Sequence, residues 1–368
     1  MNLISELETR IKGYIKLDKR HLKTFTRLMI GIMTLNTVNL SKLANLSLNE
    51  NQAKSRYRQF QRFLAKAHFD YRSIARLIFS LFDFGAIDGY YLTMDRTNWS
   101  LGKLEINILF LCIEWHGCSI PLIWLLLPHK GNSSTKHRIA LINRFINLFG
   151  QSKIKCLLAD REFIGSEWLS YLQALDIPFC IRIKKDADTT NARGKSVQVG
   201  WLCYDLKPGE QIQLANKRRI YNQWLTISAA KSPRDGQLMI VVSNRDHHGI
   251  EDYLNRWPIE CLFGYLKSRG FNFESSCLVH RARIKKLVAL LALSHCWAIS
   301  TGIWRHYNVK KIRLKKHGRK AKSFFRYGLD FLQQACWKWW VGQVKQIKQA
   351  LKLFYPKPES PLPVIQQH

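Results

Sequence analysis

Apolar and polar residues change their spacing along the chain at about residue 90. The first eighty or so residues show the three-to-four-residue spacing of amphipathic helices. Beyond Tyr90, apolar runs bounded by turn residues alternate with helical stretches. The predicted elements are, in order, strands over 90–95, 105–115 and 120–127, a helix over 136–149, a strand over 154–159, a helix over 166–175 and a strand over 179–183. This order predicts a mixed α/β sheet.

Residues 184–245 interrupt this rhythm. Pro208-Gly209 and Pro233-Arg234-Asp235-Gly236 separate short alternating segments, which predicts a small, mostly β insertion. The expected strands lie at 197–204, 211–214, 221–229 and 238–243. Helical spacing then resumes at about Gly249. Within it, residues 287–304 carry no formal charge, as in a membrane span, but the stretch is short for a span and its second half contains several polar residues. We expect a buried core helix there rather than a transmembrane helix.

Charge narrows the class of partner. The 368 residues include 58 Lys and Arg against 26 Asp and Glu, a formal net charge of +32. Nucleic acid is the first partner expected for such a chain, and an anionic membrane surface is the second. The nine cysteines include no Cys-x-x-Cys pair or zinc-finger spacing, which favours a reduced chain, and the N-terminus lacks a secretory apolar region. A cytoplasmic location is therefore expected.

Cations gather toward both ends of the chain. Residues 39–44 and 51–64 resemble the two helices of a helix-turn-helix around a turn at 46–49, and the second would carry Lys54, Arg58 and Arg62 one turn apart. The alternative is a solvated basic face on an ordinary helix bundle. Residues 305–326 hold ten further Lys and Arg. Both regions are candidates for binding the DNA backbone.

Two acids occupy matching contexts. Asp95 follows one apolar strand and Asp160 another, and each is followed by an arginine. Strand ends in α/β sheets are where sites form, although acids at such positions often only begin turns.

A third acid lies within a charged stripe. On a helical wheel of about 100° per residue, Tyr253, Arg256, Glu260 and Lys267 fall within an arc of about 60°. A solvated polar face with a Glu–Arg pair would give the same stripe. Pro258 disfavours a helical residue before it, so the helix is expected to begin or kink there.

Three carboxylates from two strands and a helix suit phosphodiester cleavage and transfer. This chemistry uses two divalent cations, and Mg²⁺ prefers carboxylate oxygens without any need for His or Cys. Asp95, Asp160 and Glu260 are therefore candidates for this chemistry.

The spacing Tyr253-(2)-Arg256-(3)-Glu260-(6)-Lys267 resembles the Y-(2)-R-(3)-E-(6)-K signature of bacterial insertion-sequence transposases of the IS4 type, relatives of the Tn5 and Tn10 transposases. Met94-Asp95-Arg96-Thr97 and Ala159-Asp160-Arg161-Glu162-Phe163 are similar to the blocks that carry the first and second acids of the family's DDE set. The resemblance covers roughly residues 88–270.

This resemblance implies an α/β, RNase H-like catalytic core with a β-rich insertion. It also implies that Asp95, Asp160 and Glu260 are the catalytic residues and bind two Mg²⁺ ions, for which Mn²⁺ substitutes. The implied regions are a helical N-terminal DNA-binding region (1–84), the first part of the core (85–184), the insertion (185–245), the second part of the core with the Glu helix (246–304) and a basic helical C-terminal region with a tail (305–368).

The resemblance also implies a function and partners. The chain would bind the terminal inverted repeats of an insertion sequence, cut them and join them to target DNA. It would act as a homodimer in the synaptic complex, without a membrane, on the bacterial nucleoid. Tyr253, Arg256 and Lys267 would hold phosphates near a flipped base. Trp201 and Trp224 are both candidates to stack on that base.

Two other functions fit the same carboxylates. An RNase H-like nuclease would cut nucleic acid without strand transfer, since the same metals perform both reactions. A catalytically inert DNA-binding regulator would keep only the basic surfaces.

Overall fold

A computed structural model describes residues 3–46, 50–101, 104–191, 193–316 and 318–356. The chain forms two compact units. The helical unit contains Met1–Ile87, Asn98–Ile106 and Glu260–His368, and the sheet unit contains Asp88–Thr97 and Asn107–Ile259. Each unit is therefore built from chain segments that are far apart in the sequence.

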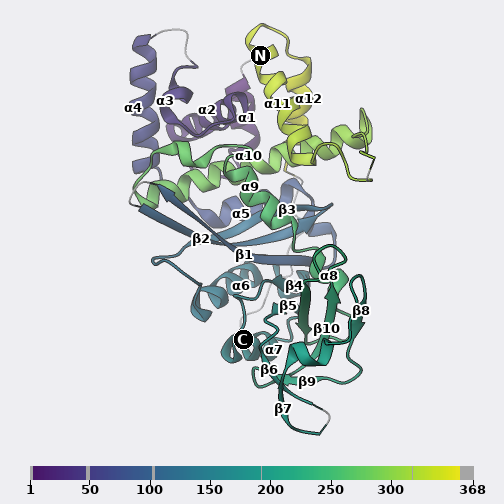
Figure 1. The fold of residues 1–368 in the computed structure, drawn as a ribbon. Coiled ribbons are helices and arrows are strands. Elements are labelled where there is room, and N and C mark those ends of the chain that lie inside the picture. Colours follow the sequence, from purple (N-terminus) through teal and green to yellow (C-terminus); the bar gives the residue numbers. More distant parts are fainter. Residues whose placement is uncertain (1–2, 47–49, 102–103, 192, 317, 357–368) are drawn as a thin grey trace. The chain divides into compact units, whose positions relative to one another are not determined.

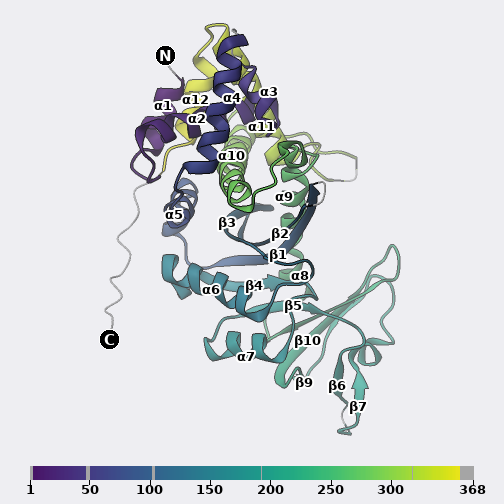
Figure 2. The same cartoon turned by 90° about the vertical axis from the view of Figure 1, so that its left-hand side faces the viewer.

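The helical unit contains the N-terminal and C-terminal helices (Figures 1 and 2). Its helices are α1 (Leu3–Ile11), α2 (Lys19–Leu35), α3 (Leu40–Ala44), α4 (Glu50–Lys66), α5 (Tyr71–Leu81), most of α9 (Pro258–Leu266), α10 (Arg281–Asn308), α11 (Phe324–Trp340) and α12 (Lys345–Leu353). The α10 helix packs against α2, α4, α5, α11 and α12 and is the centre of this unit. Asn39 caps α3, because its side-chain oxygen accepts a hydrogen bond from the backbone N–H of Lys42.

The interpretation of residues 287–304 as a core helix agrees with the position of α10. Within the described residues, α10 is the helix with the length and apolar composition of a membrane span, but 83% of its most apolar window is buried inside the protein. Two glycines allow α10 and α11 to approach closely. A Cβ on Gly302 would lie 1.9 Å from the carbonyl oxygen of Phe324, and a Cβ on Gly328 would lie 1.8 Å from that of Ala298.

The sheet unit is organised by one mixed sheet. Its strands are β1 (Tyr90–Leu101), β2 (Leu104–Trp115), β3 (Cys118–Leu126), β4 (Ile154–Ala159), β5 (Phe179–Ile183), β8 (Gln211–Gln213), β9 (Arg218–Ile220), β10 (Gln223–Lys231) and β11 (Leu238–Ser243), and β1 and β2 extend at one end into the helical unit. The order is β3-β2-β1-β4-β5-β11-β10-β8, with β9 beside β10. A separate ribbon pairs β6 (Asp188–Thr190) with β7 (Ser196–Gln198). The helices are α6 (Thr135–Phe149), α7 (Ser166–Ala174) and α8 (Ile250–Leu254).

The order of the first five strands confirms the predicted fold class. The β2 and β3 strands form an antiparallel hairpin, while β4 is parallel to both β1 and β5. His116 and Gly117 join the hairpin, and both have the positive φ values (52° and 74°) that a two-residue hairpin turn requires. The result is the mixed α/β sheet of an RNase H-like core.

Three details differ from the sequence prediction. Strand β1 does not end at Asp95 but continues to Leu101, because β2 lies beside it. Apart from the β6–β7 ribbon, the strands of the insertion do not form a sheet of their own, because β11 pairs antiparallel with β5 and so extends the central sheet. This pairing satisfies the edge of β5, which would otherwise be exposed. The expected strand at 197–204 is instead the short β7 followed by a 3-10 turn, Val199–Cys203.

Candidate active site

Asp95 lies on β1, and Asp160 directly follows the neighbouring parallel strand β4. Met94 of β1 is the register partner of Ala159 of β4, and each aspartate is the next residue along its chain. Both side chains are partly buried. The sheet therefore presents two carboxylates together where β4 ends, which is the position of ligand sites in α/β sheets.

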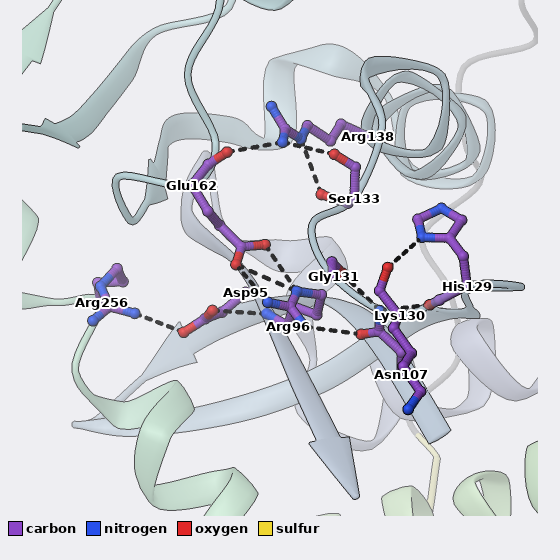
Figure 3. A network of polar contacts seen from close by, with 10 residues as sticks. All are labelled: Asp95, Arg96, Asn107, His129, Lys130, Gly131, Ser133, Arg138, Glu162 and Arg256. Carbon is purple, nitrogen blue, oxygen red and sulfur yellow. Dashed lines mark hydrogen bonds and ion pairs between the residues drawn. The ribbon is translucent and has the colours of Figure 1, made fainter. Parts of the chain in front are cut away.

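Two members of the four-residue motif contact these acids. Arg256 donates a hydrogen bond from Nη1 to Oδ2 of Asp95 at 2.7 Å (Figure 3). It donates another from Nε to the Tyr253 hydroxyl at 3.1 Å. The Tyr253 hydroxyl in turn donates to Oδ1 of Asp160 at 3.4 Å. Tyr253 and Arg256 are 5% and 6% exposed. One buried chain of polar contacts thus runs from one aspartate to the other.

Burial raises the pKa values of two side chains in this site, Asp95 and Tyr253. Desolvation raises the pKa of Asp95 from its usual 3.8 to about 6, although the Arg256 guanidinium and the N–H of Arg96 oppose the rise. The neighbouring carboxylates of Glu162 and Asp160 add to it. Burial also raises the pKa of Tyr253 to about 12. A positive charge beside Asp95 would offset the cost of burying its ionised form.

The raised pKa of Asp95 gives a pH prediction. Between pH 3.8 and about 6 the folded chain holds more protons at Asp95 than the unfolded chain, so this residue's contribution to the free energy of unfolding falls as pH rises. At about 1.4 kcal/mol per pKa unit, the loss reaches at most about 3 kcal/mol. Urea unfolding of the wild type and of Asp95→Asn between pH 4 and 7 measures it. The free energy of unfolding of the wild type, relative to that of Asp95→Asn, should fall as pH rises across this range. A difference that does not change with pH would contradict the raised pKa of Asp95.

Glu260 and Lys267 belong to the helical unit. Glu260 lies in the first turn of α9, and Lys267 follows its last residue. The Lys267 ammonium is 5.4 Å from the centre of the Trp99 ring, which also packs on Phe273 with ring centres 4.8 Å apart. The roles of Glu260 and Lys267 beside the two aspartates stay predictions from the motif.

The helix expected over the whole motif is interrupted, as Pro258 allows. The α8 helix ends at Leu254 and α9 begins at Pro258, with a turn between them. Arg256 lies in this turn, which carries its side chain back to the hydroxyl of Tyr253 on α8. Trp257, also in the turn, is 62% exposed.

A group of polar residues beside the aspartates was not anticipated from the sequence. Arg96 forms an ion pair with Glu162, with Nη2 and Oε2 3.0 Å apart (Figure 3). The Arg138 guanidinium on α6 donates to the carbonyl of Glu162 at 2.8 Å. The sequence signal was present, since Arg96 and Glu162 fall inside the two quoted Asp blocks, but nothing in their spacing pairs residues 66 positions apart.

A basic pocket of about 710 Å³ lies near Asp160 in the sheet unit. Its charged lining residues are Arg161, Arg182, Lys184, Lys185, Asp186 and Lys231. Tyr204 also lines it, and this ring stacks on Trp201 with centres 6.2 Å apart and planes at 24°. Trp201 is 69% exposed and Trp224 on β10 is 62% exposed. Of the two candidate tryptophans, Trp201 is the one that stacks on a ring lining the pocket.

The predicted basic stripe lies on α4. Lys54, Arg58 and Arg62 are exposed, while Phe60, Phe63 and Leu64 of the same helix are buried. The α3 and α4 helices occupy the two predicted helical positions, and the expected turn at 46–49 falls largely on residues 47–49, which lie outside the described residues. The exposed cations therefore form one face of an amphipathic helix.

Two acids of the predicted metal site fit a divalent cation. Asp95 and Asp160 offer the oxygen ligands that Mg²⁺ prefers, and Asp95 bears the desolvation that a bound cation would relieve. Within the part of the chain that the structure describes, no group of three or more His, Cys, Asp or Glu side chains is arranged to hold a metal ion.

Comparison with known proteins identifies the class of the chain. Residues 85–297 match the sequence model of the family described as "Transposase DDE domain". Because the match spans more than half of the 368 residues, the chain belongs to this transposase family. No curated protein sequence matches it. Among solved structures, it is similar to the piggyBac transposase in a synaptic complex with hairpin DNA, with a TM-score of 0.45 and 13% identity over 98% of this chain and 84% of that chain.

Proposed function

We propose that the chain is the transposase of an IS4-type insertion sequence. It would bind the element's terminal inverted repeats, cut the DNA there and join the freed ends to target DNA. The observation that carries this proposal is the contact of Tyr253 and Arg256, two residues of the four-residue motif, with Asp160 and Asp95, the residues directly after the register partners Ala159 and Met94. Two residues of a motif that we interpret as phosphate-binding therefore lie in the same site as two carboxylates that suit a metal ion.

The proposed metal ligands are Asp95, Asp160 and, from α9, Glu260. Two Mg²⁺ ions, or Mn²⁺ in their place, would activate the attacking oxygen and stabilise the leaving oxygen. The protein's own residues would position the DNA. Arg256 and Lys267 would bind phosphates, and the Tyr253 hydroxyl would orient Asp160 through the hydrogen bond that it donates.

The basic pocket is the proposed binding site for unpaired DNA. Five cations around one carboxylate would hold the backbone of a strand, and an exposed aromatic pair offers a stacking surface for a base. We therefore favour Trp201 over Trp224 as the residue that stacks on a flipped base. Further duplex would bind to α4 and to the cations of residues 305–326, with the chain acting as a homodimer on cytoplasmic, nucleoid DNA.

The direct test is cleavage of the element's own ends. Purified protein is incubated with Mg²⁺ and a DNA fragment that contains the coding region and its flanks. We expect cuts at imperfect inverted repeats on both sides and joining of the released ends to a second DNA. Cuts without joining would favour an RNase H-like nuclease, and binding without cuts would favour an inert regulator.

The cations of α4 give a salt-dependence prediction. Replacing Lys54, Arg58 and Arg62 together by Ala should weaken binding to duplex DNA and reduce the slope of log K against log salt by about 2.7, if each neutralises one phosphate. Lys136, Arg144 and Lys207 are also exposed but lie in the sheet unit, outside the predicted N-terminal DNA-binding region, so their triple Ala variant is a control with the same net charge that should keep the wild-type slope. Fluorescence anisotropy over a salt series measures both. An unchanged slope in the α4 variant would exclude this helix from the interface.

A further inference from the structure

The Arg96–Glu162 ion pair connects the two chain segments that carry the aspartates. Arg96 is the residue after Asp95 on β1, and Glu162 is two residues after Asp160. The guanidinium contacts the carboxylate through two nitrogens, with Nε 3.2 Å from Oε1 and Nη2 3.0 Å from Oε2. The side chains are only 17% and 20% exposed, so water weakens this pair less than a surface pair.

Each partner is held by further contacts (Figure 3). Nη1 of Arg96 donates to Oδ1 of Asn107 at 3.3 Å. The amide of Asn107 donates to the carbonyls of His129 and Gly131 at 3.0 and 2.9 Å, so it is fixed on the loop after β3. These contacts therefore orient the Arg96 guanidinium toward Glu162.

The other partner is anchored through its backbone. Arg138 is 4% exposed and donates to the carbonyls of Glu162 and Ile164 at 2.8 and 3.4 Å. The N–H of Phe163 also donates to the carbonyl of Asp160 at 2.9 Å. Arg138 thus already holds the segment after Asp160 without help from Arg96.

Because Arg138 already holds the segment after Asp160, the Arg96–Glu162 ion pair has a different role. Its effect is to connect the segment to β1 next to Asp95, whose Oδ1 accepts a hydrogen bond from the N–H of Arg96 at 2.7 Å. Any shift between Arg96 and Glu162 would change the distance between the two aspartates. By pairing with Glu162, Arg96 also neutralises a third carboxylate close to Asp95.

We propose that Arg96 and Glu162 are positioning residues that set the separation of the Asp95 and Asp160 carboxylates and thereby the affinity of this site for divalent cations. This inference rests on the proposed function for the role of the two aspartates. Neither residue contacts DNA or metal in this assignment. Groups behind metal ligands commonly contribute tenfold to a hundredfold to metal affinity, because they fix the direction of the ligands.

The test measures Mn²⁺ affinity by electron paramagnetic resonance, using the full chain without DNA. The site is defined as the Mn²⁺ binding that Asp95→Asn removes. Arg96→Gln and Glu162→Gln should each weaken this binding about tenfold or more. The double variant should lose no more than the worse single variant, because the two residues act as one pair. Arg96→Lys keeps the charge but not the two-nitrogen contact, so it should lie between Arg96→Gln and the wild type.

Arg245→Gln provides the matched control. Arg245 also joins two segments of the sheet unit through an ion pair, at 2.6 Å to Asp176, but at the end of the sheet where β5 begins. The Mn²⁺ affinity of the Arg245→Gln variant should equal that of the wild type. Wild-type affinity in folded Arg96→Lys and Glu162→Gln, or additive losses in the double variant, would overturn the proposal. A wild type that neither binds Mn²⁺ nor cuts DNA would instead refute the proposed function.

Discussion

Asp95→Asn and Asp160→Asn should each slow Mg²⁺-dependent cleavage of the element's ends by at least about a thousandfold, while binding to the same DNA persists. Asn keeps the size of the side chain but removes the charge that holds a cation, and a thousandfold corresponds to about 4 kcal/mol of transition-state stabilisation. Glu260→Gln should give the same result, because the motif assigns this carboxylate to the same metal site. Gel-based cleavage rates and a binding titration on one duplex measure the two properties separately.

Asp88→Asn is the control for this experiment. Asp88 lies just before β1, and its side chain is fully exposed beside Lys153 at 3.8 Å, so its loss should leave cleavage unchanged. Retained cleavage in all three site variants would refute the metal-dependent mechanism. Loss of DNA binding together with cleavage would assign the acids to folding rather than to chemistry.

Gly302→Ala and Gly328→Ala should each destabilise the helical unit by roughly 3 kcal/mol or more. A methyl group at either position would overlap a backbone carbonyl of the facing helix, at 1.9 and 1.8 Å, and backbone cannot rotate away as a side chain can. The sign of the effect is informative, because Gly to Ala within a helix otherwise stabilises by up to about 1 kcal/mol. Urea unfolding followed by tryptophan fluorescence measures the change.

Gly13→Ala is the comparison, since a Cβ there meets no atom within 4 Å. Its free energy of unfolding should differ from that of the wild type by less than about 0.5 kcal/mol. If Gly302→Ala proves more stable than the wild type, the close crossing of α10 and α11 is wrong.

The elements best predicted from the sequence are the buried ones. Strands β4 and β5 were expected at 154–159 and 179–183, and these are their observed bounds. Both are apolar apart from one cation each, Lys155 and Arg182, and a strand that is largely buried on both faces has this pattern whatever its partners are. The Glu162 and Arg96 side chains could not be paired in the same way, because their contact depends on the parallel register of β1 and β4.

The parts that were predicted less well depend on distant partners. The β1 strand continues past Asp95 through polar residues, because β2 lies beside it as a hydrogen-bonding neighbour. Strands β8 to β11 of the insertion join the central sheet because the edge of β5 is open to them, and a local sequence pattern does not show which sheet edges are open. In the candidate site, the two aspartates were found from strand ends, whereas the buried contacts of Tyr253 and Arg256 with them required the fold.

The division of the helical unit into three chain segments affects synthesis on the ribosome. The α2 helix, with Phe25, Leu28 and Met29 fully buried, packs against α10 and α11. The first of those helices, α10, begins about 250 residues later in the chain. At a synthesis rate of roughly 5–20 residues per second, the apolar face of α2 therefore lacks these partners for some ten to fifty seconds. A nascent chain in this state must be shielded by a chaperone or by temporary contacts. Products that end before α10 should therefore aggregate rather than persist as free DNA-binding fragments.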